Sequence, residues 1–205
     1  DQLPDPYCTR LMKLVATVPQ IKLAAEPEGQ RHRLAVKSLM EKYSDLAADV
    51  VAEFQLDDDD AVAEDFVART RAMYGIIHPL MAEHQRVTLD FCHGLMLRVL
   101  GDGFDIKPVL ARLWTPALIT YRLPEIRTVL RIIQHLDLWE HMPTLSIEKP
   151  LMFVRGAHED NVSNFAKRWD KLGLADQNLG DVNLLLAGRF GIDLDAFQQE
   201  RAALG

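Results

Sequence analysis

Apolar residues in the first half of the chain recur every three or four positions, which is the spacing of one face of an α-helix. Between residues 30 and 56 this spacing predicts one helix of about seven turns, with charged residues on its other side. A second pattern over 61–100 predicts another long helix, which Pro79 should kink or break near His78. The apolar positions are Leu34, Leu39, Met40, Tyr43, Leu46, Ala47, Val50, Val51 and Phe54 in the first pattern, and Val62, Phe66, Met73, Ile76, Ile77, Leu80, Met81, Phe91, Leu95, Met96 and Val99 in the second.

An acidic run, Asp57–Asp60, separates the two patterns. Adjacent carboxylates cannot pack in an apolar core, but they suit the start of a helix, where free N–H groups and the helix dipole favour negative charge. We therefore expect Asp60 to be the N-cap of the second helix. Gly101-Asp102-Gly103 predicts a turn. It divides a single helical domain into two loosely distinct halves, 1–101 and 102–205.

The second half of the chain predicts shorter elements. Helices are expected over 105–114, 124–140, 160–172, 181–190 and 193–204, several of them starting at Asp or at a residue followed by proline. Residues 144–147 and 151–154 predict two short extended segments, a β-hairpin-like excursion near 144–154. The whole pattern predicts an all-α fold, a compact multi-helix bundle of about seven to ten helices.

Composition places the chain among ordinary globular proteins. Hydrophobic residues make up 48% of the 205 positions and charged residues 26%, which excludes a disordered or fibrous chain. The net charge of −7 argues against nonspecific binding to nucleic acid or to an anionic membrane. Cys8 and Cys92 show no metal-ligand spacing, and no apolar run is long enough to cross a bilayer. We expect a cytoplasmic protein without membrane insertion.

Charge is unevenly distributed along the chain. Residues 86–171 hold 12 basic and 10 acidic side chains, whereas both ends are acidic. Arg127, Arg131 and His135 follow one another at steps of four in the predicted helix 124–140, and Arg122 stands just before it. We predict that these four residues form an exposed basic stripe that binds another protein or a second copy of the chain. The alternative is a solvated helix face paired with nearby carboxylates.

The sequence shows no catalytic or cofactor-binding motif. It lacks a Gly-x-Ser-x-Gly elbow, a phosphate-binding glycine loop and a dinucleotide fingerprint. His78, His84 and His93 are spaced so that, on a helix, their rings point in different directions and cannot share a metal. We therefore expect no catalytic residues, no cofactor and no metal site. A helical enzyme or metal protein with a buried site that includes His78, Glu83 or His84 is one alternative.

Residues 184–205 carry the most specific local pattern, with small Ala187, Gly191 at a turn, and the apolar spacers Leu186 and Phe190. This segment resembles a helix-turn-helix element, in which one helix buttresses the next. Its second helix is acidic, which favours a structural corner over DNA binding. The sequence thus favours a non-enzymatic interaction subunit, such as an adaptor, regulator or assembly component. A nucleic-acid-associated subunit that uses the basic middle and this corner is the other alternative.

Overall fold

The computed structural model describes residues 4–24, 31–101, 103–130, 133–157, 169 and 179–204. The chain divides into two compact units, Asp1–Ser44 and Asp45–Gly205. The described part of the first unit contains the helices α1 (Tyr7–Thr17) and α2 (His32–Tyr43). Only α2 matches the helix predicted over 30–56. The remainder of that prediction is wrong, because Val51–Phe54 forms a strand.

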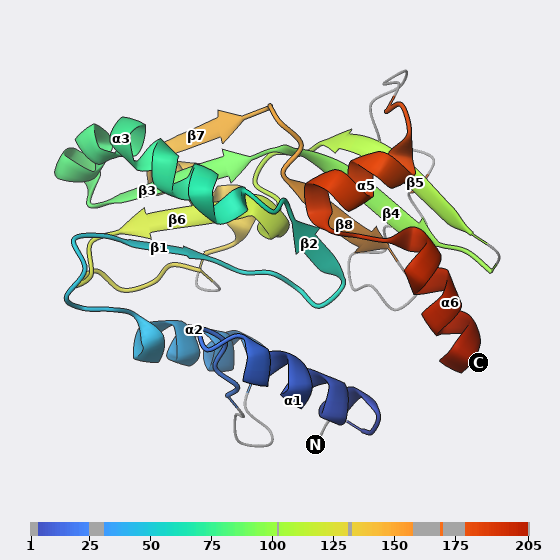
Figure 1. Ribbon diagram of the computed structural model, residues 1–205. Coiled ribbons are helices and arrows are strands. Elements are labelled where there is room, and N and C mark those ends of the chain that lie inside the picture. The colour runs from blue at the N-terminus through green and yellow to red at the C-terminus, as the bar shows by residue number, and fades with distance from the viewer. Residues whose placement is uncertain are drawn as a thin grey trace. The chain divides into compact units, whose positions relative to one another are not determined.

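Two four-stranded sheets form the framework of the second unit within the described residues (Figure 1). Sheet A has the order β1-β6-β3-β7, and sheet B has the order β2-β8-β4-β5. The predicted all-α bundle is therefore wrong, since the fold is mixed α/β. The strands are β1 (Val51–Phe54), β2 (Asp60–Val62), β3 (Arg86–Phe91), β4 (His93–Val99), β5 (Phe104–Leu110), β6 (Leu118–Arg122), β7 (Thr144–Ile147) and β8 (Phe153–Ala157).

Sheet A directs three of its strands the same way. β6 is antiparallel to both β1 and β3, whereas β3 and β7 are parallel. β1, β3 and β7 therefore share a direction, and each continues along the chain into sheet B: β1 into β2, β3 into β4, and β7 into β8. The extended segments predicted near 144–154 are confirmed as β7 and β8, but they belong to different sheets and do not form a hairpin.

The connections between the sheets are bonded to one another. Cys92 N donates to Ile147 O at 3.0 Å, and Ala111 N donates to Cys92 O at 2.8 Å. The return connection from β5 to β6 includes the 3-10 helix η1 (Thr115–Ala117), which contacts β1, β2 and β8. We call the region formed by residues 55–59, 92, 111–117 and 148–152 the sheet junction. The carboxyl ends of β1, β3 and β7 all lie at this junction.

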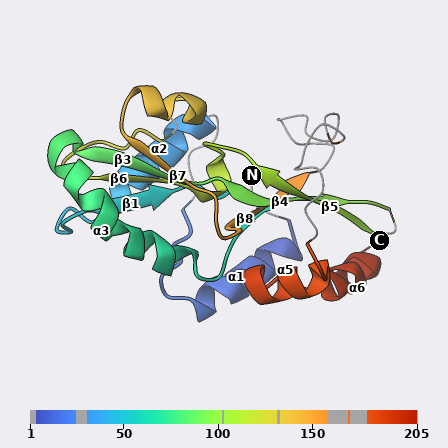
Figure 2. The ribbon, with the colours of Figure 1, turned by 90° about the horizontal axis from the view of Figure 1, so that it is seen from above.

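Sheet A is covered on both faces. Helix α3 (Phe66–His84) packs on β3 and β6, and the segment that includes the 3-10 helix η2 (His135–Glu140) lies on the opposite side (Figure 2). β4 carries the consecutive apolar residues Leu95, Met96 and Leu97, whose spacing imitates that of a helix, whereas β3 alternates polar and apolar residues as strands do. The helix predicted over 61–100 is therefore wrong beyond His84, and it is also wrong at its start, where Ala61 and Val62 belong to β2. Of the kink or break predicted near His78, the break is absent, because α3 continues through Pro79.

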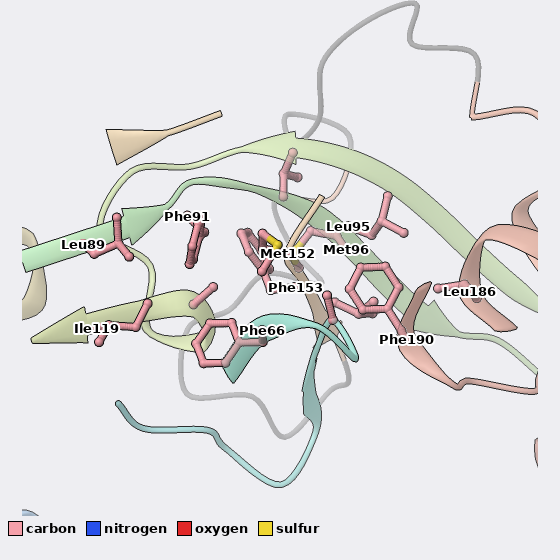
Figure 3. Close-up of a cluster of buried hydrophobic side chains, with 14 of the residues drawn as sticks. Phe66, Leu89, Phe91, Leu95, Met96, Ile119, Met152, Phe153, Leu186 and Phe190 are labelled. Atoms are coloured by element: carbon pink, nitrogen blue, oxygen red, sulfur yellow. The ribbon is translucent and has the colours of Figure 1, made fainter. Parts of the chain in front are cut away.

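The main core joins the two sheets to the helices. Phe66 from α3, Phe91 from β3, Leu95 from β4 and Phe153 from β8 pack together, and α5 (Val182–Phe190) adds Phe190 to the same cluster (Figure 3). α5 and α6 (Leu194–Leu204) confirm the two helices predicted at the C-terminal end. Gly191 ends α5 with φ at +64°, a conformation that glycine adopts without strain.

Several other predicted elements are corrected. Residues 105–114 do not form a helix, since most of them belong to β5, and in the range 124–140 the described helical part is η2 alone. The turn near Gly101 connects β4 to β5, with Leu100 N donating to Gly103 O at 2.8 Å. The helix predicted over 160–172 lies outside the described residues, apart from Trp169. The division into halves at residue 101 stays a prediction.

Candidate functional site

The acidic run begins two residues beyond the end of β1, after Gln55 and Leu56, at the sheet junction. Residues 55–59 connect β1 to β2, and Asp60 is the first residue of β2, where it lies opposite Arg155 of β8. The predicted N-cap role of Asp60 is therefore wrong. Helix α3 begins six positions later, at Phe66, and Asp65 occupies its N-cap position. In sheets with parallel strands, ligands bind outside the carboxyl ends of those strands, which is where the acidic run is found.

A close backbone approach fixes the acidic run against β8. Gly156 N donates to Asp59 O at 3.0 Å. A Cβ atom at position 156 would lie 2.4 Å from the same oxygen, so β8 can approach this closely only because residue 156 is glycine. Gln55 Nε2 also donates to Asp57 Oδ1 at 2.8 Å. The run is thus held by backbone and side-chain contacts at both of its ends.

Asp60 is the electrostatically unusual member of the run. The pKa of its carboxyl is raised to about 7, mainly by burial and also by the charges of Asp59 and Asp57, while Arg155 and the nearby Gly156 N–H oppose the shift. Within the part of the chain that the structure describes, both carboxylate oxygens are inaccessible to solvent and have no hydrogen-bond partner. A buried, unpaired carboxylate is costly, and a nearby positive charge would relieve that cost.

Arg155 and Trp114 lie beside the acidic run. The guanidinium carbon of Arg155 is 5.1 Å from the centre of the Trp114 ring, a cation–π arrangement. The same ring packs on Phe153, with ring centres 6.3 Å apart. Trp114 immediately precedes η1, which contacts both β1 and β2. The site therefore combines carboxylates, one guanidinium and a half-buried aromatic ring.

A second polar group lies where β3 and β7 end. Asp90 is fully buried, and its Oδ2 accepts a hydrogen bond from Ser146 Oγ at 2.9 Å. Burial raises the pKa of Asp90, while the Leu113 N–H, Ser146 and Arg112 oppose the shift. Burial, together with the charge of Asp90, also raises the pKa of Cys92 to about 11. Cys92 therefore stays a thiol at neutral pH and is a poor nucleophile.

The four residues predicted to bind a partner are not brought together on one helix face, because the helix expected over 124–140 is not formed. Arg122 is buried and ion-paired with Glu53. Arg127 is exposed. His135 is half-buried, with Nδ1 bonded to Leu113 O, and Arg131 lies outside the described residues. Partner binding by any of the four stays a prediction.

The histidines proposed as an alternative site lie on α3. His84 is 3.8 Å from Glu83, and the His78 ring packs on Tyr74. Among the described residues, no group of three His, Cys, Asp or Glu side chains is arranged to hold a metal ion. In the same residues, no helix is both long and apolar enough to cross a membrane.

Sequence reasoning missed the acidic run as a site because it assigned Val51–Phe54 to a helix. Recognising a short strand before Asp57 would have placed four carboxylates at the end of that strand. The acidic run also does not line the pocket between β1 and α3. That pocket, of about 460 Å³, is lined by apolar residues with Thr70, Arg71, Tyr74 and Tyr121, and by none of the four aspartates.

The sequence matches the profile of a known protein family. The profile of the family described as "Putative rhamnosyl transferase" matches residues 1–168, a range that includes the whole sheet junction. No curated protein and no solved structure matches the chain. The match indicates a glycosyltransferase-like function, so the prediction of a regulatory, all-α protein is wrong. Because the match spans most of the 205 residues, the chain belongs to this rhamnosyl transferase family.

Proposed function

We propose that the protein transfers a rhamnosyl group from a nucleoside diphosphate-activated donor to a hydroxyl group of an acceptor, and that the donor diphosphate binds at the acidic run. The observation that carries the proposal is Asp60. Its carboxylate oxygens are inaccessible to solvent and have no hydrogen-bond partner among the described residues, and they lie at the start of β2, next to the sheet junction and inside the region that matches the family.

The reaction sets the demands on the site. The bond between C1 of the sugar and the diphosphate oxygen breaks, and a bond forms between C1 and the acceptor oxygen. The acceptor proton leaves to a base, and the bonding electron pair stays on the diphosphate, which gains negative charge. The site must therefore concentrate positive charge near the leaving group.

The acidic run fits a divalent cation that is shared with the donor. Mg²⁺ is usually held by one or two carboxylates together with substrate phosphates and water, so a three-ligand protein cage is not required. Asp60 is the first candidate ligand, and Asp57 and Asp59 are close enough to raise its pKa. A bound Mg²⁺ would neutralise the charge that develops on the diphosphate.

Arg155 and Trp114 supply two further functions. The Arg155 guanidinium is suited to a phosphate oxygen, since it is a permanent positive charge with several N–H donors. The Trp114 ring presents an apolar face beside it, which suits the C–H face of a sugar ring. These two residues would orient the donor, and a cation at the acidic run would hold its diphosphate.

Donor turnover tests the proposal. Purified protein is incubated with dTDP-, UDP- or GDP-activated rhamnose and Mg²⁺, and released nucleoside diphosphate is measured with and without added acceptor glycans. We expect release with one of the donors, its loss on chelation with EDTA, and a decrease of about 100-fold or more for Asp60→Asn. Asp195→Asn, an exposed carboxylate in α6, is the matched control and should keep full activity.

A binding measurement accompanies the turnover assay. With Mg²⁺ present, the correct donor should raise the Tm of the wild type but not that of Asp60→Asn, because ligand binding stabilises only the folded state. The proposal fails if no donor is turned over and none raises the wild-type Tm at millimolar concentration. It also fails if Asp60→Asn and the wild type behave alike in both measurements.

A further inference from the structure

Leu113 adopts a backbone conformation that is unusual for its residue type. Its φ is +61°, in the left-handed region, although it carries a branched side chain and is 7% exposed. A non-glycine residue in this region is strained, and it persists only where its surroundings impose the conformation. Leu113 also directly precedes Trp114, the aromatic residue of the proposed site.

Three groups surround Leu113. Its side chain packs in a small second core with Leu118, Val129, Leu138 and Met142. Its carbonyl oxygen is bonded to Nδ1 of His135. Because a carbonyl only accepts, the ring nitrogen must be the donor and carry the proton. The backbone N–H of Leu113 donates a hydrogen bond to the buried carboxylate of Asp90, which opposes the rise of the Asp90 pKa.

The direction of the chain after Leu113 sets the place of Trp114. Trp114 is extended, with φ −83° and ψ 138°, and it leads into η1 against β1, β2 and β8. The chain before Leu113 is anchored by the bond from Ala111 N to Cys92 O. With that end fixed, the left-handed turn at Leu113 determines whether the Trp114 ring reaches Phe153 and the Arg155 guanidinium.

We infer that His135 is a positioning residue for the proposed rhamnosyl transfer site: its bond to the Leu113 carbonyl holds the left-handed turn that places Trp114 against Arg155. This inference rests on the proposed function for its catalytic consequence. The positioning itself is a property of the folded protein and can be measured without any substrate.

Fluorescence quenching measures the positioning directly. Trp139 is 61% exposed and is replaced by Phe, while Trp169 is only 2% exposed, so the emission that acrylamide quenches comes mainly from Trp114. In this background, His135→Ala should raise the quenching constant about twofold, because the released segment samples open conformations. His135→Phe keeps a ring but removes the donor, and it should behave like His135→Ala.

Two variants separate a lost hydrogen bond from a general disturbance. His135→Asn offers an amide N–H near the place of Nδ1 and should restore the wild-type quenching constant. His141→Ala removes an exposed histidine from the same segment and should leave the constant unchanged. The inference is overturned if His135→Ala and His135→Phe fold, keep their circular dichroism spectra, and quench like His141→Ala.

Activity then gives a second, separate readout. In an active enzyme, His135→Ala should lower kcat/KM for the donor about tenfold, mostly through KM, since a misplaced binding residue weakens productive binding. His135→Asn should recover most of that loss. If quenching changes as expected but the wild type turns over no donor, the positioning role stands and the proposed function fails. If folding is lost in both His135→Ala and His135→Phe but kept in His135→Asn, the donor bond holds the turn as inferred.

Discussion

Arg122 and Glu53 form an ion pair inside the protein, with Nε of the arginine 3.1 Å from Oε2 of the glutamate and with exposures of only 2% and 8%. The same guanidinium donates from its NH1 group to the carbonyl oxygens of Pro124 at 3.2 Å and Ile126 at 2.8 Å. Arg122 therefore links β1 to the segment that follows β6. The Arg122 charge therefore stabilises the fold from inside the protein. The sequence pattern predicted an exposed position for it, and this prediction is wrong.

Removing one member of this pair should be strongly destabilising. Glu53→Ala leaves the Arg122 charge buried without its counter-ion, and the expected loss of unfolding free energy is about 3–5 kcal/mol. Urea denaturation monitored by circular dichroism measures it. Glu125→Ala, which removes an exposed carboxylate, should cost less than about 0.5 kcal/mol. Equal losses for the two variants would show that the buried pair has no special weight.

Asp60 predicts a pH dependence of stability. Its pKa is about 7 in the folded protein and 3.8 ordinarily, so the protonated form is favoured by folding. The stabilisation is complete below about pH 4 and is lost as the pH rises through 7. Each pKa unit corresponds to about 1.4 kcal/mol, and solvent screening of this half-buried group reduces the total to about 2 kcal/mol.

Asp60→Asn tests this dependence, because asparagine does not titrate. Relative to the wild type, the variant should be more stable at pH 8.5 by about 2 kcal/mol, with the difference vanishing near pH 4. Denaturation curves across this range measure the difference. A constant difference between the two proteins at every pH would contradict the assignment of the titration to Asp60.

Arg155 should set the acidic limb of the activity profile. Its positive charge lowers the pKa of Asp60, so Arg155→Gln should raise that pKa and move the rise of kcat/KM with pH upward by about one unit. Arg98→Gln, which removes the partner of Asp105 in sheet B, is the control and should lower activity little without moving the limb. An unmoved limb in Arg155→Gln would separate Arg155 from the titration of Asp60.

Two glycines should respond oppositely to alanine. Gly156→Ala forces a Cβ against the Asp59 carbonyl oxygen and should cost about 2 kcal/mol or more of stability. Gly75 lies within α3 with open space around the position of a Cβ, so Gly75→Ala should stabilise by about 0.5–1 kcal/mol. Thermal denaturation compares the two, and stabilisation by both would refute the close approach at Asp59.

The helices at the C-terminal end could be predicted because their signals are local. Asp181 accepts a hydrogen bond from Leu184 N at 3.1 Å and caps α5, and Gly191 ends it. The residues in these contacts lie within a few positions of each other, so the local sequence is enough to predict them. The same reasoning predicted α6, where Asp193 accepts from Ala196 N at 3.0 Å.

Most of the strands were missed because the contacts that stabilise them come from residues distant in sequence. Leu89 of β3 pairs with Ile119 and Leu145, and both faces of the strand are covered. β4, with the consecutive apolar residues Leu95, Met96 and Leu97, resembles a helix in a short window, whereas β3 (Arg86–Phe91) alternates polar and apolar residues, a strand signal that the helical interpretation overlooked. Because β1 was not predicted, the acidic run could not be recognised as a site, since its position near the end of a strand is what makes it a candidate for ligand binding.

The routing of β1, β3 and β7 from one sheet into the other makes the junction a poor place for sequence change. A residue inserted between Cys92 and His93 would shift the register of β4 against β5 and β8 together, and so turn every inward side chain of that strand outward. The turn between β4 and β5, where Leu100 N donates to Gly103 O, lies at the far end of the same strands, so an insertion there would leave their register unchanged. Length variation and peptide tags therefore belong at this turn, and the crossing points should keep a constant length wherever the activity is retained.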